Sequence, residues 1–142
     1  MALSREIRRD GRLAARPGPG EAALVEDATI DRVRELCREL PECEVTSGQH
    51  HTIAVRGRTL AWHTVDHHGD GRVALTVRAA RGENAELVAA DPDRFFLPRY
   101  VAHHGYVGVY LDTGDVDWEE IRELLLDAYR LVAPKTLARR LD

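Results

Sequence analysis

Two stretches of the chain carry apolar residues at helical spacing. The first begins at Thr29, whose hydroxyl is expected to cap a helix, and ends at Pro41. The second begins at Asp117, which forms an Asp variant of the capping box with Glu120 three positions later. The apolar stripe of this second stretch comprises Trp118, Ile121, Leu124, Leu125, Ala128, Leu131 and Val132. The pattern predicts two amphipathic helices that each bury one face.

Between these stretches the hydrophobic period falls to two, which is typical of strands. Residues 51–55, 59–65 and 72–77 are rich in β-branched and aromatic side chains and are separated by glycine-containing turns. We therefore predict a three-stranded antiparallel meander. Two further strands are expected over residues 95–102 and 106–111.

The remaining elements complete a simple order. Residues 83–90 hold good helix formers and are followed by Asp91-Pro92, which predicts a short helix. Residues 135–141 are expected to form a basic final turn or short helix. The order is thus α, three strands, α, two strands, α. No strand-helix-strand crossover repeats, so the pattern favours a two-layer α+β domain with a mainly antiparallel sheet, one face of which is bare or only partly covered.

Length and composition suit one cytoplasmic domain. The chain has 142 residues, of which 44% are hydrophobic, and this is enough for one packed core. Its longest apolar runs are far shorter than the roughly 20 residues that cross a bilayer, so no membrane partner is expected. No apolar stretch follows the N-terminal arginines, as a secretory signal would require. We expect residues 1–27 to be a flexible basic leader and residues 28–142 to be the folded domain.

Charge is distributed unevenly along the chain. The first 20 residues carry +3, and because the whole chain carries −4, residues 21–142 carry −7. An acidic domain disfavours tight, non-specific binding to phosphates. The two cysteines, Cys37 and Cys43, match neither a redox pair nor a zinc knuckle, which favours reduced structural thiols.

The candidate catalytic and metal-binding motifs are incomplete. Asp112-Thr113-Gly114 resembles the loop of aspartic proteases, but that chemistry needs two carboxylates that share a proton, and only one copy occurs. The triplet is better interpreted as the turn between a strand and a capped helix. Three adjacent histidine pairs occur, yet neighbours on a strand point to opposite faces and no metal-binding motif is present. We predict no metal, no cofactor and no enzymatic activity, with proton transfer by His63 or His103 the least supported alternative.

Strand alternation predicts one distinctive surface. Val73, Leu75 and Val77 point to one face of their strand, while Arg72, Thr76 and Arg78 point to the other. In the strand that begins at Tyr106, the residues Val107, Val109 and Leu111 likewise oppose Tyr106, Gly108 and Tyr110. If the aliphatic residues face the helices, arginine and tyrosine share the second face, which suits base stacking and phosphate contact. The alternative is that these amphipathic side chains only cover a solvent-facing sheet.

A family resemblance covers residues 28–140. The segment FFLPRYVAHHGYVGVYLD, followed by VDWEE and DAYRLVAPK, is similar to the MmcQ/YjbR family, especially its actinobacterial-type members. The resemblance implies a compact, double-wing-like α+β fold and a DNA-binding role that itself rests on likeness of fold. Members often carry arginine and tryptophan where this chain has His104 and Tyr106. The resemblance implies no catalytic residues.

These observations leave two functional hypotheses. The first is a DNA-binding module with weak, salt-sensitive affinity. Its expected nucleic-acid-binding residues are Arg56, Arg58, Arg72, Arg78, Tyr106, Tyr110 and Lys135, with Arg139 and Arg140 extending a basic rim. The second is a module that binds a protein partner or a small molecule and has no nucleic-acid role. The acidic domain and the excess of tyrosine over lysine motivate the second hypothesis.

Overall fold

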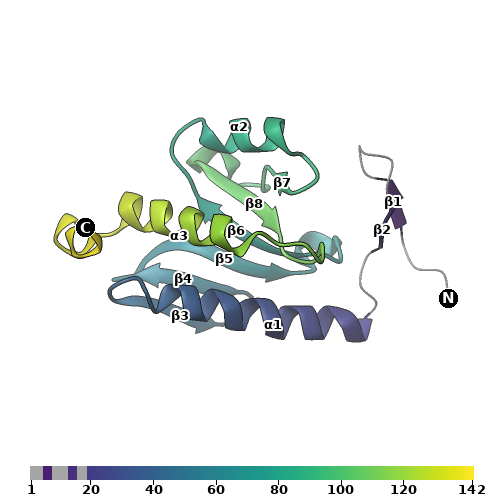
Figure 1. The fold of residues 1–142 in the computed structure, drawn as a ribbon, viewed down its shortest axis with the longest axis horizontal. Helices are drawn as coiled ribbons and strands as arrows, with labels where there is room; N and C mark the ends of the chain where they lie inside the picture. The colour runs from purple at the N-terminus through teal and green to yellow at the C-terminus, as the bar shows by residue number, and fades with distance from the viewer. Residues whose placement is uncertain (1–4, 8–12, 16–18) are drawn as a thin grey trace.

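The computed structural model describes residues 5–7, 13–15 and 19–142, and within these ranges the main element is a six-stranded sheet. Its strands are β3 (Cys43–Ser47), β4 (His51–Val55), β5 (Arg58–Val65), β6 (Val73–Arg78), β7 (Phe95–Phe96) and β8 (Tyr106–Tyr110). The order across the sheet is β3-β4-β5-β6-β8-β7, and every neighbouring pair is antiparallel (Figure 1). Two short strands outside this sheet, β1 (Arg5–Ile7) and β2 (Leu13–Ala15), pair with each other.

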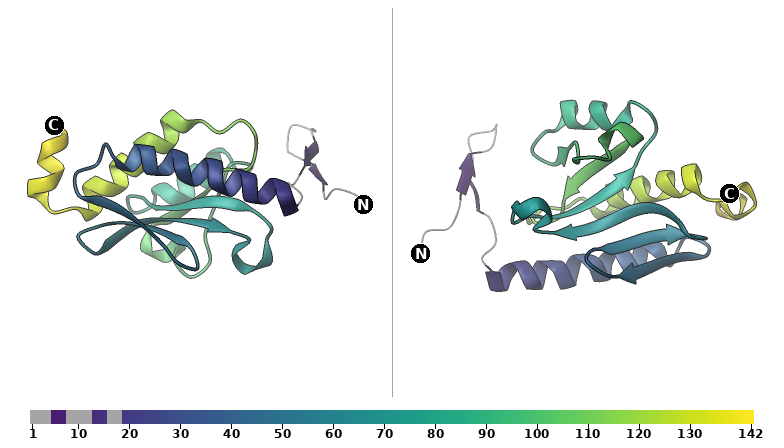
Figure 2. Two further views of the ribbon diagram at one scale, coloured as in Figure 1. Left: turned by 90° about the horizontal axis from the view of Figure 1, so that it is seen from below. Right: turned by 180° about the vertical axis from the view of Figure 1, so that it is seen from behind.

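Helices cover one face of the sheet. The helical elements are α1 (Pro19–Cys37), α2 (Glu83–Ala90), α3 (Trp118–Val132), α4 (Lys135–Ala138) and the 3-10 turns η1 (His67–Gly69), η2 (Ala102–His104) and η3 (Arg139–Leu141). Helices α1 and α3 lie on the same side of the sheet, whereas α2 lies at the β7–β8 edge (Figure 2). The two layers predicted from the sequence are therefore present, and the α+β fold class is confirmed.

The core lies between the sheet and helices α1 and α3. Leu75, Val77 and Val107 are fully buried on the sheet side, and Val33 and Tyr129 are fully buried on the helix side. Burial of such side chains contributes roughly 1.5–3 kcal/mol each. The predicted strand alternation therefore places the aliphatic residues beneath the helices. No helix among the described residues has the length and apolarity to span a membrane.

The predicted start of the first helix was wrong. Helix α1 begins at Pro19, and Thr29 lies in its interior, where its hydroxyl donates to the carbonyl of Val25 at 2.6 Å. Proline is well tolerated in the first turn of a helix, because its missing N–H has no intrahelical partner there. Part of the predicted leader is therefore helical, while residues 1–4, 8–12 and 16–18 of that leader lie outside the described residues.

The predicted strand over residues 95–102 was also too long. Strand β7 ends at Phe96, and Pro98, which cannot donate a ladder hydrogen bond, lies where the chain leaves the sheet. The sheet gains instead an edge strand, β3, ahead of the predicted meander. That meander, β4-β5-β6, is confirmed, as is the cap of α3, where the Asp117 carboxylate accepts from the N–H of Glu120 at 3.1 Å.

Candidate ligand pocket on the open face of the sheet

The face of the sheet opposite α1 and α3 is called here the open face. Its side chains follow from the register: Trp62 of β5 pairs with Thr76 of β6, which pairs with Gly108 of β8. Arg78 likewise pairs with Tyr106. Alternation along each strand therefore brings hydroxyl, aromatic and cationic side chains to this face, as the sequence predicted.

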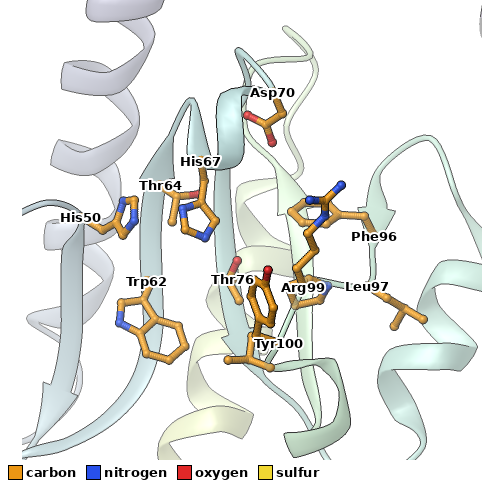
Figure 3. A pocket seen from close by; sticks show the side chains of 12 residues that line it. His50, Trp62, Thr64, His67, Asp70, Thr76, Phe96, Leu97, Arg99 and Tyr100 are labelled. Atoms are coloured by element: carbon orange, nitrogen blue, oxygen red, sulfur yellow. The ribbon is translucent and has the colours of Figure 1, made fainter.

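The open face contains a hollow of about 440 Å³, within the size range of small-molecule sites. It is lined by His50, Trp62, Thr64, His67, Asp70, Thr76, Phe96, Leu97, Pro98, Arg99, Tyr100 and Val101. These residues come from the sheet, from the turn between β3 and β4, from the turn after β5 and from the segment that follows β7 (Figure 3). We call this hollow the open-face pocket. Its lining is mainly apolar and aromatic, with a few polar groups.

The floor of the pocket depends on a glycine. Phe96 of β7 pairs with Gly108 of β8, and a Cβ added at Gly108 would overlap the Phe96 ring. The missing side chain thus lets the ring lie flat against the strand, where it stacks on Tyr110 with ring centroids 4.7 Å apart. The hydroxyls of Thr64 and Thr76, both buried, form the polar part of the floor.

Two histidines close one end of the pocket. The rings of His50 and His67 make an edge-to-face contact with centroids 4.6 Å apart. The Nδ1 atom of His50 is buried and has no hydrogen-bond partner among the described residues. Burying an unpaired polar atom costs roughly 1–3 kcal/mol, so this nitrogen is suited to pairing with a bound molecule.

The rim is formed by the segment between β7 and η2. Tyr100 is 77% exposed and has φ 68°, a left-handed conformation that is unfavourable for an aromatic residue. Arg99 beside it is exposed, and Leu97 is half exposed. An exposed aromatic ring, an apolar side chain and a cation therefore surround the opening, with Asp70 also on the lining.

Arg72 and Asp112 anchor the strand ends beside the pocket. The Asp112 carboxylate accepts from Nε and Nη2 of Arg72, with closest distances of 3.0 and 2.8 Å, and from the N–H of Val73 at 2.8 Å. Its side chain is 1% exposed and that of Arg72 is 15% exposed. Burial opposes the charge on Arg72, but the bonds to Asp112 outweigh it and raise the pKa of Arg72. This explains the Asp-Thr-Gly triplet as a structural anchor.

The predicted nucleic-acid residues differ widely in their surroundings. The guanidinium carbon of Arg72 lies 3.7 Å from the ring centroid of Tyr110, so both side chains are engaged within the fold. Tyr106 is 5% exposed, its hydroxyl donates to the carbonyl of Thr59 at 3.3 Å, and burial raises its pKa. The shared face predicted for these residues is confirmed, whereas the expected exposure of Arg72 and Tyr106 is not.

The other predicted contacts lie toward the surface. Arg56 is exposed and its Nη2 atom donates to Oε2 of Glu42 at 2.9 Å. Arg58, Arg78 and Lys135 are exposed as well. None of the predicted residues lines the open-face pocket. Their role in nucleic-acid binding remains a prediction.

A second histidine cluster lies on the helix-covered face. His63 is 1% exposed, and its Nε2 atom lies 2.8 Å from the hydroxyl of Thr29. Because that hydroxyl donates to Val25, it accepts from His63, which assigns the proton to Nε2 and leaves Nδ1 unpaired. Burial, reinforced by nearby His51, lowers the pKa of His63 to about 4. His63 is therefore a neutral core residue at pH 7.

The paired histidines separate as expected where they flank a strand. His50 lines the pocket, while His51 faces the other side, with its ring 5.6 Å from that of His63. His103 and His104 lie in the turn η2, where both are exposed and their rings are 3.9 Å apart. The described residues contain no group of three or more His, Cys, Asp or Glu side chains that could hold a metal ion.

Comparisons with known proteins agree with this fold. Residues 38–131 match the family model described as YjbR. The crystal structure of protein DR2400 from Deinococcus radiodurans, with the family-model domain DUF419, superposes with a TM-score of 0.62 at 25% identity. The alignment covers 79% of this chain and 86% of DR2400. No curated protein matches the chain.

Proposed function

The chain belongs to the YjbR family, and from that premise we propose that it is a non-catalytic binding module that holds a small organic ligand in the open-face pocket. The observation that carries the proposal is the pocket itself. It combines a volume of about 440 Å³ and aromatic walls with a buried, unpaired nitrogen of His50. A concave, mainly apolar site with a few polar groups is typical of small-molecule recognition.

The predicted Arg/Tyr surface supports a ligand pocket better than a phosphate-binding surface. Arg72 is neutralised by Asp112, and its guanidinium lies over the Tyr110 ring. Tyr106 is enclosed and contacts the ring of Trp62, with centroids 4.9 Å apart. These side chains therefore act as a rigid support beside the pocket wall formed by Trp62.

A screen of metabolites by thermal unfolding tests the proposal. A compound at about 100 times its Kd adds about 2.7 kcal/mol to the free energy of unfolding. Thr64→Leu, which places added bulk in the pocket, should abolish the ligand-induced rise in Tm. Thr52→Leu is the matched control, since Thr52 pairs with Trp62 on the same face but does not line the pocket. Equal responses from both variants would locate binding elsewhere and reject the proposal.

DNA binding is a second candidate, and one observation favours it. Arg56 and Arg140 both act on the carboxylate of Glu42, so the β4–β5 turn and the C-terminal turn lie near each other. Exposed cations at this end of the molecule include Arg58, Lys135, Arg139 and Arg140. Such a group could contact the backbone of duplex DNA without using the open face.

Salt titration tests this second candidate. Each neutralised phosphate should contribute roughly 0.9 to the slope of log affinity against log salt. The combined variant Arg58→Ala, Lys135→Ala, Arg139→Ala should flatten that slope, whereas Arg81→Ala, an exposed arginine in another turn, should not. Absence of measurable binding at about 50 mM salt would reject DNA as the ligand.

A further inference from the structure

Resting on the proposed function, we propose that the ligand of the open-face pocket is a planar nitrogen heterocycle that carries an anionic group, the chemistry of a nucleoside monophosphate. Three features of the pocket carry this inference: its aromatic walls, its hydrogen-bonding floor and end, and the cation on its rim.

The aromatic walls suit a flat ring. Trp62 projects from β5, and Tyr100 stands across from it on the rim segment (Figure 3). Tyr100 is 77% exposed and lies on the lining, so its ring contributes aromatic surface at the pocket mouth. Aromatic side chains stack on heterocycles whatever the identity of the ring, because every such ring has a π-face.

The polar groups suit the edge of a heterocycle. Thr64 and Thr76 offer hydroxyls, which can donate or accept, from adjacent strands. The unpaired Nδ1 of His50 adds one more donor or acceptor at the end of the pocket. A purely aliphatic ligand would leave this nitrogen unsatisfied, whereas ring nitrogens and exocyclic groups can pair with it.

The positive charge of Arg99 on the rim favours a ligand whose anionic substituent lies on the Arg99 side of the pocket. Arg99 is exposed and its side chain lies on the lining beside Phe96 (Figure 3). The carboxylate of the lining belongs to Asp70, which accepts from the backbone N–H of Arg72 at 2.9 Å and would repel an anion. The anionic group is therefore expected beside Arg99 and away from Asp70. A phosphate there would receive charge-assisted hydrogen bonds from the guanidinium.

This chemistry has two sources, a free mononucleotide or an unpaired nucleotide of a single strand. The pocket is open at its rim, so a connected strand could leave past Tyr100. Both sources predict the same contacts inside the pocket, and affinity for the monomer relative to a short oligonucleotide separates them.

Tryptophan fluorescence provides a local test. The chain has two tryptophans, and Trp118 lies at the start of α3, outside the pocket. In the full-length Trp118→Phe variant, Trp62 is the remaining tryptophan, and a stacked ring should quench its emission. The probes are AMP and CMP, adenosine without phosphate, ribose 5-phosphate without a base, inorganic phosphate, and a short oligodeoxyadenylate.

We expect AMP or CMP to quench Trp62 and to bind about tenfold more tightly than adenosine. Arg99→Ala should remove that difference, while Arg81→Ala should retain it. Tyr100→Ala should weaken nucleoside binding about tenfold, with Leu131→Ala as the control for an exposed apolar residue. Because Arg99 and Tyr100 are exposed, these variants should fold.

The outcomes separate this inference from the proposed function. Preference for the oligonucleotide would support the inference with a single strand as source, and equal or weaker binding would support it with a free nucleotide. Equal affinity for AMP and adenosine, or quenching only by compounds that lack a heterocycle, would overturn it while the pocket remained a ligand site. No quenching by nucleotides, together with no response to Thr64→Leu in the metabolite screen, would overturn both.

Discussion

The two faces of one sheet differ in what they bury. Beneath α1 and α3 the strands present Val, Leu and Ile side chains that are almost fully buried, and the polar residue His63 is held there by Thr29. On the open face the same strands present threonine, tryptophan and tyrosine, together with a glycine that makes room for a ring from β7. One face is a packed core, and the other retains a hollow.

The difference shows how one strand, whose successive side chains point to opposite faces, can contribute to both stability and ligand recognition. A residue at an odd position of β6 can be selected for packing, while its neighbour at an even position remains available for a ligand. Leu75 and Thr76 illustrate this, because both are buried but only Thr76 lines the pocket. The contrast yields four predictions, given below from the largest expected effect to the smallest.

The largest loss of stability should come from breaking the ion pair between Arg72 and Asp112. Asp112→Ala leaves the largely buried guanidinium of Arg72 without its partner, and the loss of unfolding free energy should be about 3–5 kcal/mol. Glu42→Ala removes the partner of the exposed Arg56 and should have a much smaller effect, because solvent screens an ion pair at the surface. Urea unfolding measures both. Similar losses for the two variants would show that the anchor is no stronger than a surface ion pair.

The next prediction compares substitutions at two adjacent residues of β6, Leu75 on the helix-covered face and Thr76 on the open face. Leu75→Ala opens a cavity beneath the helices and should cost about 2–5 kcal/mol. Thr76→Val exchanges the hydroxyl for a methyl group and should cost no more than the net contribution of one hydrogen bond, up to about 1.5 kcal/mol, yet it removes a polar group from the pocket and should weaken ligand binding. Chemical denaturation and ligand titration together check the pair. A large loss of stability in Thr76→Val with unchanged binding would contradict the division of roles.

His63 should make the helix-covered face sensitive to acid. Its pKa is about 4 in the folded protein and near its ordinary value of 6.5 when unfolded, so the unfolded chain binds the extra proton first. Its stabilising contribution is full above pH 6.5 and falls by about 3 kcal/mol as the pH drops to 4. His63→Leu should flatten that part of the pH profile, and His104→Gln, an exposed control, should not. An unchanged profile in His63→Leu would assign the acid response to other groups.

The smallest effect concerns charge at the pocket. Asp70→Asn removes a negative charge from the lining and should strengthen the binding of an anionic ligand about two- to fivefold. The gain should shrink at high salt, and adenosine should show none. Isothermal titration with AMP and adenosine measures the difference. A gain of equal size for the neutral ligand would mean that Asp70 acts through shape and not through charge.

Much of the fold followed from local pattern. Helix α2 covers the predicted residues 83–90, and the Asp117 cap and the β4-β5-β6 meander are confirmed. These elements depend on propensity, capping and alternation within a few residues. The start of α1 was missed because Pro19-Gly20 suggested a break in the chain, although a proline in the first turn is compatible with a helix.

The pocket could not be predicted in the same way. Its residues come from separate segments, and the rim over residues 97–101 has no regular period. The pairing of Arg72 with Asp112 joins positions 40 residues apart and has no local pattern. Alternation did bring Trp62, Thr64 and Thr76 to one face, so the signal that could have suggested the pocket was the cluster of hydroxyl and aromatic residues at even positions of β5 and β6.

The contact between Gly108 and Phe96 has a practical consequence. A Cβ at position 108 would overlap the phenyl ring, so any side chain there must displace a ring that lines the pocket. Replacement of this glycine by alanine would therefore reshape the pocket wall through Phe96 while every residue of the lining kept its identity. Such a variant would serve as a reference molecule in cells, in which a single methyl group alters the recognition surface and a thermal melt checks that the fold is kept.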